Sequence, residues 1–217
     1  MKRLLKEAIK KNYFPRKLKY IVERKIHDRD IAKWERCGKP IPPPHIVKQR
    51  TLKYYAKKFN LSLFVETGTY YGDMVEAMKD NFQQIYSIEL SEKLYELAKI
   101  RFNAEKNIIL IQGDSGTELR NLINKLEQPT LFWLDGHYSG GVTAKSNQNT
   151  PILQELSHIF NAKVLHHVII IDDAHSFETD PSYPNINKLV DFIKSNRPNT
   201  NIEIKDNIIR ILPKLTL

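Results

Sequence analysis

The stretch from Leu61 to Gly72, LSLFVETGTYYG, constrains the fold of this 217-residue chain most strongly. An apolar strand ends at Glu66, a glycine-containing turn follows, and an amphipathic helical pattern begins near Asp73. In an open α/β sheet, such a unit places backbone N–H groups and a helix N-terminus at the carboxyl edge of the sheet, where they face a ligand. The turn is therefore a candidate ligand-binding loop, and an ordinary strand–helix turn is the alternative.

The glycine spacing distinguishes between two classes of cofactor. Dinucleotide sites use G-x-G-x-x-G because a pyrophosphate must approach bare backbone, whereas this turn contains only Gly68 and Gly72. A second apolar run ends at Glu89, where an acid would accept hydrogen bonds from ribose hydroxyls. An acid followed by G-x-x-x-G resembles motif I of the class I S-adenosylmethionine (SAM) methyltransferases. That resemblance implies that the cofactor is SAM and that the following residues bind it: Glu66, Thr67, Gly68, Thr69, Gly72 and Glu89.

The alternation of strand and helix patterns predicts the architecture. We expect strands near residues 62–66, 84–89, 107–111, 130–135 and 166–172, and helices near 73–80, 91–103, 115–126, 150–161 and 185–195. Two short apolar runs at the end, 201–205 and 208–212, flank Asp206-Asn207, a pair that favours a tight hairpin turn. This pattern predicts an α/β, Rossmann-like class I methyltransferase fold, with a mainly parallel seven-stranded sheet and a C-terminal antiparallel hairpin.

The positive charge is concentrated near the N-terminus. The net charge is +9, but residues 1–60 alone carry +14 and the remainder carries −5. We expect residues 1–45 to form a basic helical extension with a proline-rich linker, and residues 46–217 to form the SAM-dependent methyltransferase domain. A basic segment of this kind can meet nucleic acid, an anionic membrane surface or a phosphorylated substrate, or it can be a solvated face. Its helices are also a candidate interface for a homo-oligomer.

Cysteine content and hydropathy bear on the compartment. Cys37 is the single cysteine, so no internal disulfide framework exists, and no apolar run approaches the roughly 20 residues of a membrane span. These features predict a cytoplasmic protein without a transmembrane segment. Peripheral association with the inner membrane surface is compatible with the basic segment.

Acidic residues follow three of the expected strands. Asp114 and Ser115 follow the third strand, where an acid resembles the residue that binds the adenine amine of SAM; capping of the next helix is the alternative. Asp135 ends the fourth strand, and Asp172 and Asp173 stand at the end of the fifth. Three carboxylates at adjacent strand ends would repel one another, which suggests a bound divalent cation, although capping or pairing with lysine would also explain some of them.

Taken together, these motifs resemble the metal-dependent sugar O-methyltransferases related to the macrocin and novobiocin enzymes, and methyltransferases of bacterial surface-polysaccharide clusters. The likeness spans residues 45–212. It implies that Asp135, Asp172 and Asp173 bind Mg²⁺ or Mn²⁺, and that Asp135 also borders the cofactor and is a candidate general base. The chain departs from the family pattern at His137, which stands in place of a second acid, so His137 and His175 are further candidate bases.

The resemblance predicts a SAM-dependent O-methyltransferase, metal-assisted, which methylates a hydroxyl of a saccharide or a related small molecule. The acceptor would be a surface polysaccharide or natural-product sugar, free or as a sugar-nucleotide or lipid-linked form. The loop 140–150 has the composition of a substrate lid, and Lys145 in it is a candidate phosphate contact. Two alternatives are an RNA ribose methyltransferase that uses the basic segment, which we rank lower, and a non-catalytic scaffold with a degenerate cofactor site.

Overall fold

A computed structural model describes residues 16–136 and 150–214, with side chains from residue 24 onward. The chain forms two compact units, Met1–Lys48 and Gln49–Leu217, and the division falls within a helix. The sequence predicts a boundary slightly earlier, after residue 45. Each unit is considered by itself.

The described part of the first unit consists of one long helix and a proline-rich segment. Helix α2 (Arg16–Arg36) begins directly after Pro15, and the following segment leads into α3 (His45–Lys58). The indole N–H of Trp34 donates to the carbonyl of Pro40 at 2.8 Å, which ties the end of α2 to this segment.

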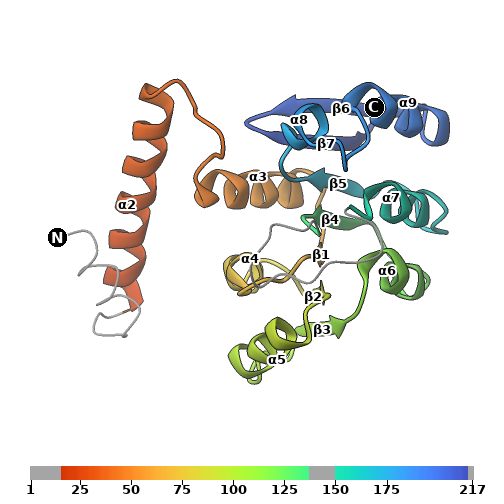
Figure 1. Ribbon diagram of the computed structural model, residues 1–217. Helices are drawn as coiled ribbons and strands as arrows, with labels where there is room; N and C mark the ends of the chain where they lie inside the picture. The colour runs from red at the N-terminus through yellow and green to blue at the C-terminus, as the bar shows by residue number, and fades with distance from the viewer. Residues whose placement is uncertain (1–15, 137–149, 215–217) are drawn as a thin grey trace. The chain divides into compact units, whose positions relative to one another are not determined.

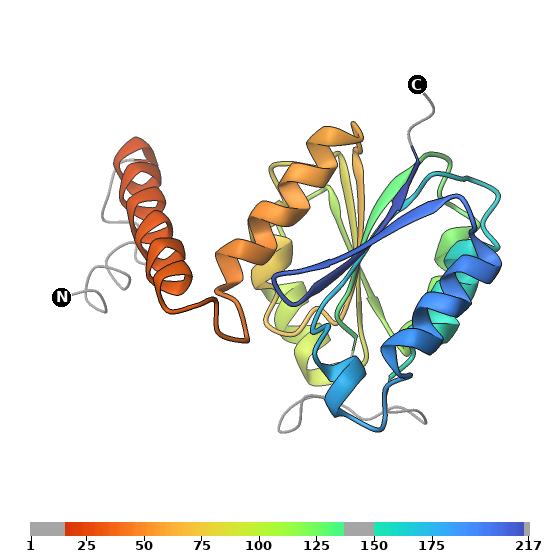
Figure 2. The same ribbon diagram turned by 90° about the horizontal axis from the view of Figure 1, so that it is seen from above.

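The second unit is a single sheet covered by helices on both faces (Figures 1 and 2). Its strands are β1 (Leu63–Thr67), β2 (Gln84–Glu89), β3 (Ile108–Gln112), β4 (Thr130–Leu134), β5 (Val168–Ile171), β6 (Thr200–Lys205) and β7 (Ile208–Pro213). Its remaining helices are α4 (Asp73–Met78), α5 (Glu92–Arg101), α6 (Ser115–Ile123), α7 (Ile152–Phe160), α8 (Ser176–Thr179) and α9 (Ile186–Asn196).

The strand order is β3-β2-β1-β4-β5-β7-β6. Strands β1 to β5 are parallel, β7 is antiparallel to β5, and β6 pairs with β7 as a hairpin. The predicted mainly parallel seven-stranded sheet with a C-terminal antiparallel hairpin is therefore confirmed. The predicted fifth strand is shorter than expected, because the backbone of His166 is left-handed (φ +66°) and pairing begins at Val168.

Alternate residues of the central strands fill two separate cores, one on each face of the sheet. The core beneath α3, α4 and α5 contains Phe64, Ile85, Trp133 and Ile170. The core beneath α6, α7 and α9 contains Val65, Ile88, Phe132 and Ile169. Because the central strands are buried on both faces, packing fixes their register, and the register sets where each strand ends.

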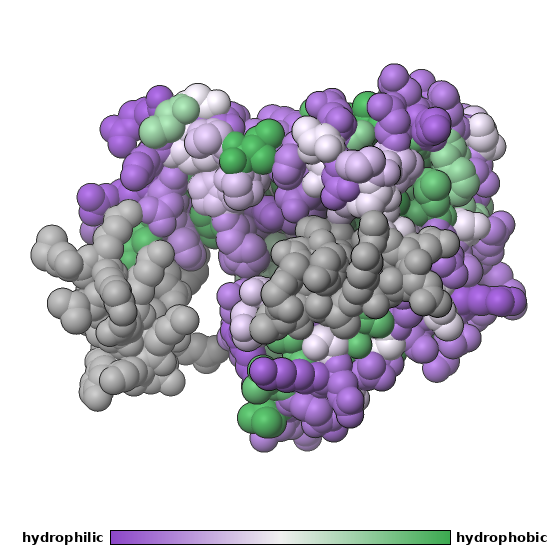
Figure 3. Space-filling view, in the orientation of Figure 1, coloured by the Kyte–Doolittle hydropathy of each residue, from purple (hydrophilic) through white to green (hydrophobic). Residues whose placement is uncertain are grey.

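The surface of the second unit is mainly polar. On the face seen in Figure 3, hydrophobic side chains form small separate areas among hydrophilic ones. Exposed apolar residues include Tyr54, Ile100 and Ile204, which belong to different elements. Among the helices of the described ranges, none is both long enough and apolar enough to cross a membrane.

Candidate active site

The carboxyl ends of the parallel strands meet at one edge of the sheet and bring the predicted site residues together. Hydrogen bonds continue one residue beyond the paired strands: Asp135 N donates to Thr67 O at 3.1 Å, and Asp172 N donates to Leu134 O at 3.1 Å. The backbones of β1, β4 and β5 are thus tied together where the acids leave the sheet.

The turn after β1 passes very close to the end of β4. Gly68 has a left-handed backbone (φ +86°), and a Cβ built on it would lie 2.6 Å from the carbonyl oxygen of Asp135. Only glycine fits this approach. Gly68 N donates to Ile88 O at 2.9 Å, so the turn is also fixed to β2. Contacts with the end of β4 on one side and with β2 on the other therefore hold the turn in place.

Glu66 faces the interior of the sheet and not solvent. Its Oε2 accepts a hydrogen bond from Ser87 Oγ at 2.6 Å, and Ser87 Oγ also lies 2.6 Å from Thr69 Oγ1. All three residues are buried. Burial raises the pKa of Glu66 well above its usual value, while the bond from Ser87 acts in the opposite direction. These linked side chains connect Thr69 of the candidate loop to β1 and β2 through buried hydrogen bonds.

Glu89 lies at the end of β2 with both carboxylate oxygens occupied by backbone donors. Tyr70 N donates to Oε2 and Ser91 N to Oε1, each at 2.8 Å. Burial raises the pKa of Glu89, and these N–H donors lower it. A carboxylate has four lone pairs, so these backbone donors do not exhaust its acceptor capacity. The residue is thus held rigidly with acceptor capacity left over.

Asp114 and Ser115 lie where β3 passes into α6. Asp114 occupies the N-cap position, but its side chain makes no capping hydrogen bond. The alternative interpretation, that the Asp114 carboxylate caps α6, is therefore not supported. Its position at the same edge as Glu89 remains compatible with the predicted adenine contact.

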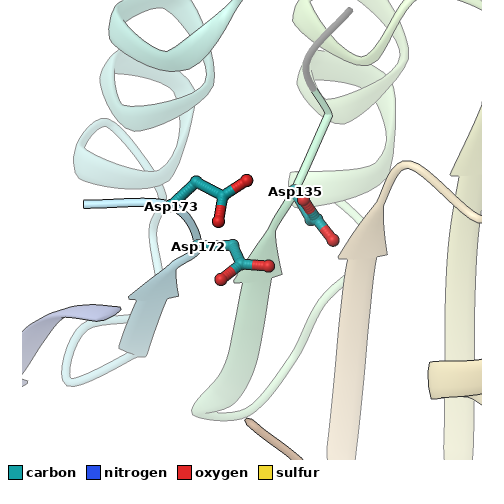
Figure 4. A group of neighbouring side chains, drawn as sticks. All are labelled: Asp135, Asp172 and Asp173. Atoms are coloured by element: carbon teal, nitrogen blue, oxygen red, sulfur yellow. The ribbon is translucent and has the colours of Figure 1, made fainter. Parts of the chain in front are cut away.

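Asp135, Asp172 and Asp173 form a compact acidic cluster (Figure 4). One oxygen from each carboxylate lies within 4.8 Å of the other two. Asp172 is buried, and Asp135 and Asp173 are partly exposed. Ligands on opposite sides of a Ca²⁺ or Mg²⁺ ion are about 4–5 Å apart, so the spacing and the all-oxygen donor set fit a hard divalent cation.

The conformation of Asp173 explains how two consecutive residues reach one cluster. Neighbouring side chains in an extended strand point to opposite faces. Asp173 leaves the strand conformation with φ +51°, a left-handed backbone that aspartate tolerates better than most residues. The turn brings its carboxylate back beside that of Asp172.

Of the predicted bases, Asp135 lies in the cluster and His137 lies outside the described residues. His175 lies two residues after Asp173 in the chain, and its ring Nδ1 lies 3.1 Å from Asn207 Oδ1. Because an amide oxygen can only accept, Nδ1 is the donor in this contact. By contrast, His167 lies at the opposite edge, where its Nδ1 accepts from Thr130 N at 3.1 Å.

Three residues at this edge were not predicted from the sequence. Glu155 of α7 and Tyr183 line a small cavity together with Asp172. Burial raises the pKa of Glu155 to about 7, although the hydroxyls of Ser115 and Thr67 act against the shift. Burial and then the charge of Asp173 raise the pKa of Tyr183. The third residue is Asn207, which contacts both Asp173 and His175.

A signal for Glu155 exists in the sequence. It is an isolated acid on the apolar face of α7, which Ile152, Leu156 and Ile159 define at helical spacing. An acid at a core position is rare unless it has a partner or a function.

No protein-family model and no curated protein matches the sequence. Solved structures do match its fold. The O-methyltransferase TomG of Streptomyces achromogenes, involved in tomaymycin synthesis and solved with SAM, is 13% identical, with a TM-score of 0.56 over 87% of this chain and 89% of that one. An O-methyltransferase from Bacillus cereus, solved with SAH, is 12% identical, with a TM-score of 0.58 over 96% and 97%.

An rRNA methylase candidate from Clostridium thermocellum is also similar, with 15% identity and a TM-score of 0.55 over 74% of this chain and 94% of that one. The chain therefore has the class I methyltransferase fold. These neighbours thus include O-methyltransferases and an rRNA methylase candidate that share one fold.

Proposed function

We propose that this chain, built on the class I methyltransferase fold, is a SAM-dependent O-methyltransferase that uses a divalent cation to methylate a saccharide hydroxyl. The observation that carries the proposal is the convergence of three carboxylates within 4.8 Å beside a rigid cofactor-type loop. Acids this close are stable together when a cation neutralises them.

The loop and its neighbours fit the cofactor. The close approach of Gly68 to β4 leaves backbone groups of residues 67–72 at the sheet edge, where the methionine moiety would lie. Glu89 would accept from the ribose hydroxyls, because its carboxylate is fixed by Tyr70 N and Ser91 N. Asp114 and Ser115 would bind the adenine, and Asp135 would border the sulfonium. Glu66 and Thr69 would hold the loop in its binding conformation through their hydrogen bonds with Ser87.

Asp135, Asp172 and Asp173 would hold Mg²⁺ or Mn²⁺. Such an ion lowers the pKa of a bound hydroxyl and fixes its orientation. By holding the ion, the three carboxylates would fix the position of the acceptor oxygen, and methyl transfer would form the carbon–oxygen bond as the carbon–sulfur bond of SAM breaks. The hydroxyl proton then passes to a base on the protein.

His175 is our first candidate for that base, with Asp135 and His137 as the others. The contact of Nδ1 with Asn207 Oδ1 leaves Nε2 available to accept a proton. Its position two residues after Asp173 keeps it next to the cluster.

Vicinal sugar hydroxyls suit this site because two neighbouring oxygens can chelate one cation. We propose a surface-polysaccharide or natural-product sugar as the acceptor, in a nucleotide- or lipid-linked form that the basic N-terminal region would attract. We further propose that the protein works in the cytoplasm or at the inner membrane surface, and that the N-terminal helices join copies into an oligomer.

The first experiment is to titrate SAM, and separately Mg²⁺, into the full chain by calorimetry, with EDTA as the metal-free condition for SAM. Asp172→Ala is the test variant, and Asp191→Ala, an exposed aspartate on α9, is the matched control. We expect micromolar SAM binding in all three proteins and loss of Mg²⁺ binding only in Asp172→Ala.

Methyl incorporation with Mg²⁺ should then be measured on sugar nucleotides and on RNA. Transfer to sugars that EDTA abolishes would support the proposal. SAM binding without a metal site would remove the metal from the mechanism. Transfer to RNA ribose alone would favour the alternative acceptor, and failure to bind SAM would refute the methyltransferase activity.

A further inference from the structure

The turn of the C-terminal hairpin reaches the acidic cluster from the antiparallel side of the sheet. Asp206 (φ +52°) and Asn207 (φ +60°) are both left-handed, as a two-residue type I′ turn requires. Because β7 runs antiparallel to β5, with Ile209 opposite Ile171, the turn lies at the edge where Asp172 and Asp173 leave β5. Ala174 N donates to Asn207 O at 2.9 Å and fixes this placement.

The side chain of Asn207 bridges two residues of the site. Its Oδ1 accepts from His175 N at 2.8 Å, and its Nδ2 donates to Asp173 Oδ1 at 3.2 Å. A backbone N–H can only donate, so the amide oxygen must face His175 and the amide nitrogen must face Asp173. One amide thus contacts both a cluster carboxylate and the neighbouring histidine.

A neutral donor is well suited to this position. Asp173 has to turn back toward Asp172 through a left-handed backbone, and the amide N–H holds its carboxylate without adding charge to the cluster. Hydrogen-bond partners that orient metal ligands typically contribute about 10- to 100-fold to metal affinity.

We infer that Asn207 is a positioning residue of the metal site: it orients Asp173 for the cation and holds His175 with Nδ1–H directed away from the acceptor. This inference rests on the metal-assisted function proposed above. It assigns to the C-terminal hairpin a role in the site, in addition to its role at the edge of the sheet.

Asn207→Gly tests the side chain alone. Glycine adopts the left-handed conformation readily, and an Asp-Gly pair is favoured in a type I′ turn, so the backbone of the hairpin is preserved. Asp206→Gly is the matched control, since it changes the neighbouring left-handed residue of the same turn and keeps the amide.

The probe is Mn²⁺ alone, titrated into the full chain without SAM or acceptor. We expect Asn207→Gly to weaken Mn²⁺ binding about 10- to 100-fold and Asp206→Gly to leave it within about twofold. SAM affinity should be unchanged in both variants, which shows that the fold is intact. In ¹⁵N NMR spectra of the neutral imidazole, His175 should carry its proton on Nδ1 in the wild type and lose this preference in Asn207→Gly.

The outcomes separate this inference from the proposed function. Mn²⁺ binding by Asn207→Gly at wild-type strength would overturn the positioning role and leave the metal site standing. Equal weakening in both glycine variants would also overturn it, because the turn backbone would then be responsible. Absence of Mn²⁺ binding in the wild type would overturn the metal mechanism and this inference with it.

Discussion

The hydroxyl of Ser87 donates a 2.6 Å hydrogen bond to the carboxyl group of Glu66 in the interior of the sheet. The two residues are direct neighbours in the register of β1 and β2. Both are almost fully inaccessible to water. Burying a carboxyl group costs free energy unless hydrogen bonds compensate, so the bond from Ser87 should contribute to stability.

Replacing Ser87 with alanine should therefore destabilise the second unit. We expect the free energy of unfolding to fall by about 1–3 kcal/mol, because a buried acceptor loses its donor. Urea denaturation measures the change. Ser195→Ala, at an exposed position of α9, is the control and should have an effect near zero. An equal effect of the two substitutions would contradict the role of Ser87.

Replacing Gly68 with alanine should disturb the cofactor loop. The new Cβ would lie 2.6 Å from the Asp135 carbonyl oxygen, so the loop or the end of β4 must move. We expect SAM affinity to fall at least about tenfold, which corresponds to about 1.4 kcal/mol. Gly38→Ala is the control, since Gly38 is also left-handed but has no neighbour within 4 Å of the built Cβ. Unchanged affinity in Gly68→Ala would show that the loop does not bind the cofactor.

Replacing Glu89 with glutamine should weaken SAM binding. The new amide group would face a backbone N–H of Tyr70 or Ser91, and the charged acceptor for ribose would be lost. Hydrogen bonds to charged groups contribute about 1.5–3 kcal/mol, so a loss of about 10- to 100-fold in affinity is expected by calorimetry. Glu92→Gln, at an exposed position of α5, should bind SAM as the wild type does.

Glu155 should make stability depend on pH in the absence of divalent cations. Its folded pKa is raised to about 7, so the unfolded chain loses this proton first and the free energy of unfolding falls as pH rises from about 4.5 to about 7. The full loss is about 3 kcal/mol. Glu155→Gln removes this titration. The free energy of unfolding of the variant, relative to that of the wild type, should therefore increase by about that amount as pH rises from 5 to 8.

Urea titrations in EDTA at these two pH values check the prediction. Parallel pH profiles for the wild type and Glu155→Gln would show that the carboxyl group titrates normally.

The sequence was sufficient to predict the sheet and the positions of the acids, for a physical reason. Strand periodicity and the strand-end acids are local properties, and the carboxyl ends of parallel strands must share one edge. Asp135, Asp172 and Asp173 could therefore be expected together before any coordinates, and the structure brings their carboxylates within 4.8 Å.

Contacts that depend on register or on antiparallel geometry could not be predicted in the same way. That Glu66 bonds Ser87 follows from which residues of β1 and β2 are paired, and no single strand encodes this pairing. Asn207 was predicted as a turn residue only, because its contact with Asp173 depends on β7 lying beside β5. The short helix α8 has only four residues, too few for a periodic signal.

The placement of the C-terminal hairpin also bears on the order in which the proposed site would be completed during synthesis. Asp135 and Asp172 are translated well before Asn207, yet Asp173 and His175 are held by that later residue. A nascent chain that has released only its first five strands has β5 as an open edge and a cluster without its last support. On the metal-assisted function proposed above, cation binding and completion of the sheet would both await the synthesis of the same hairpin, β6 and β7.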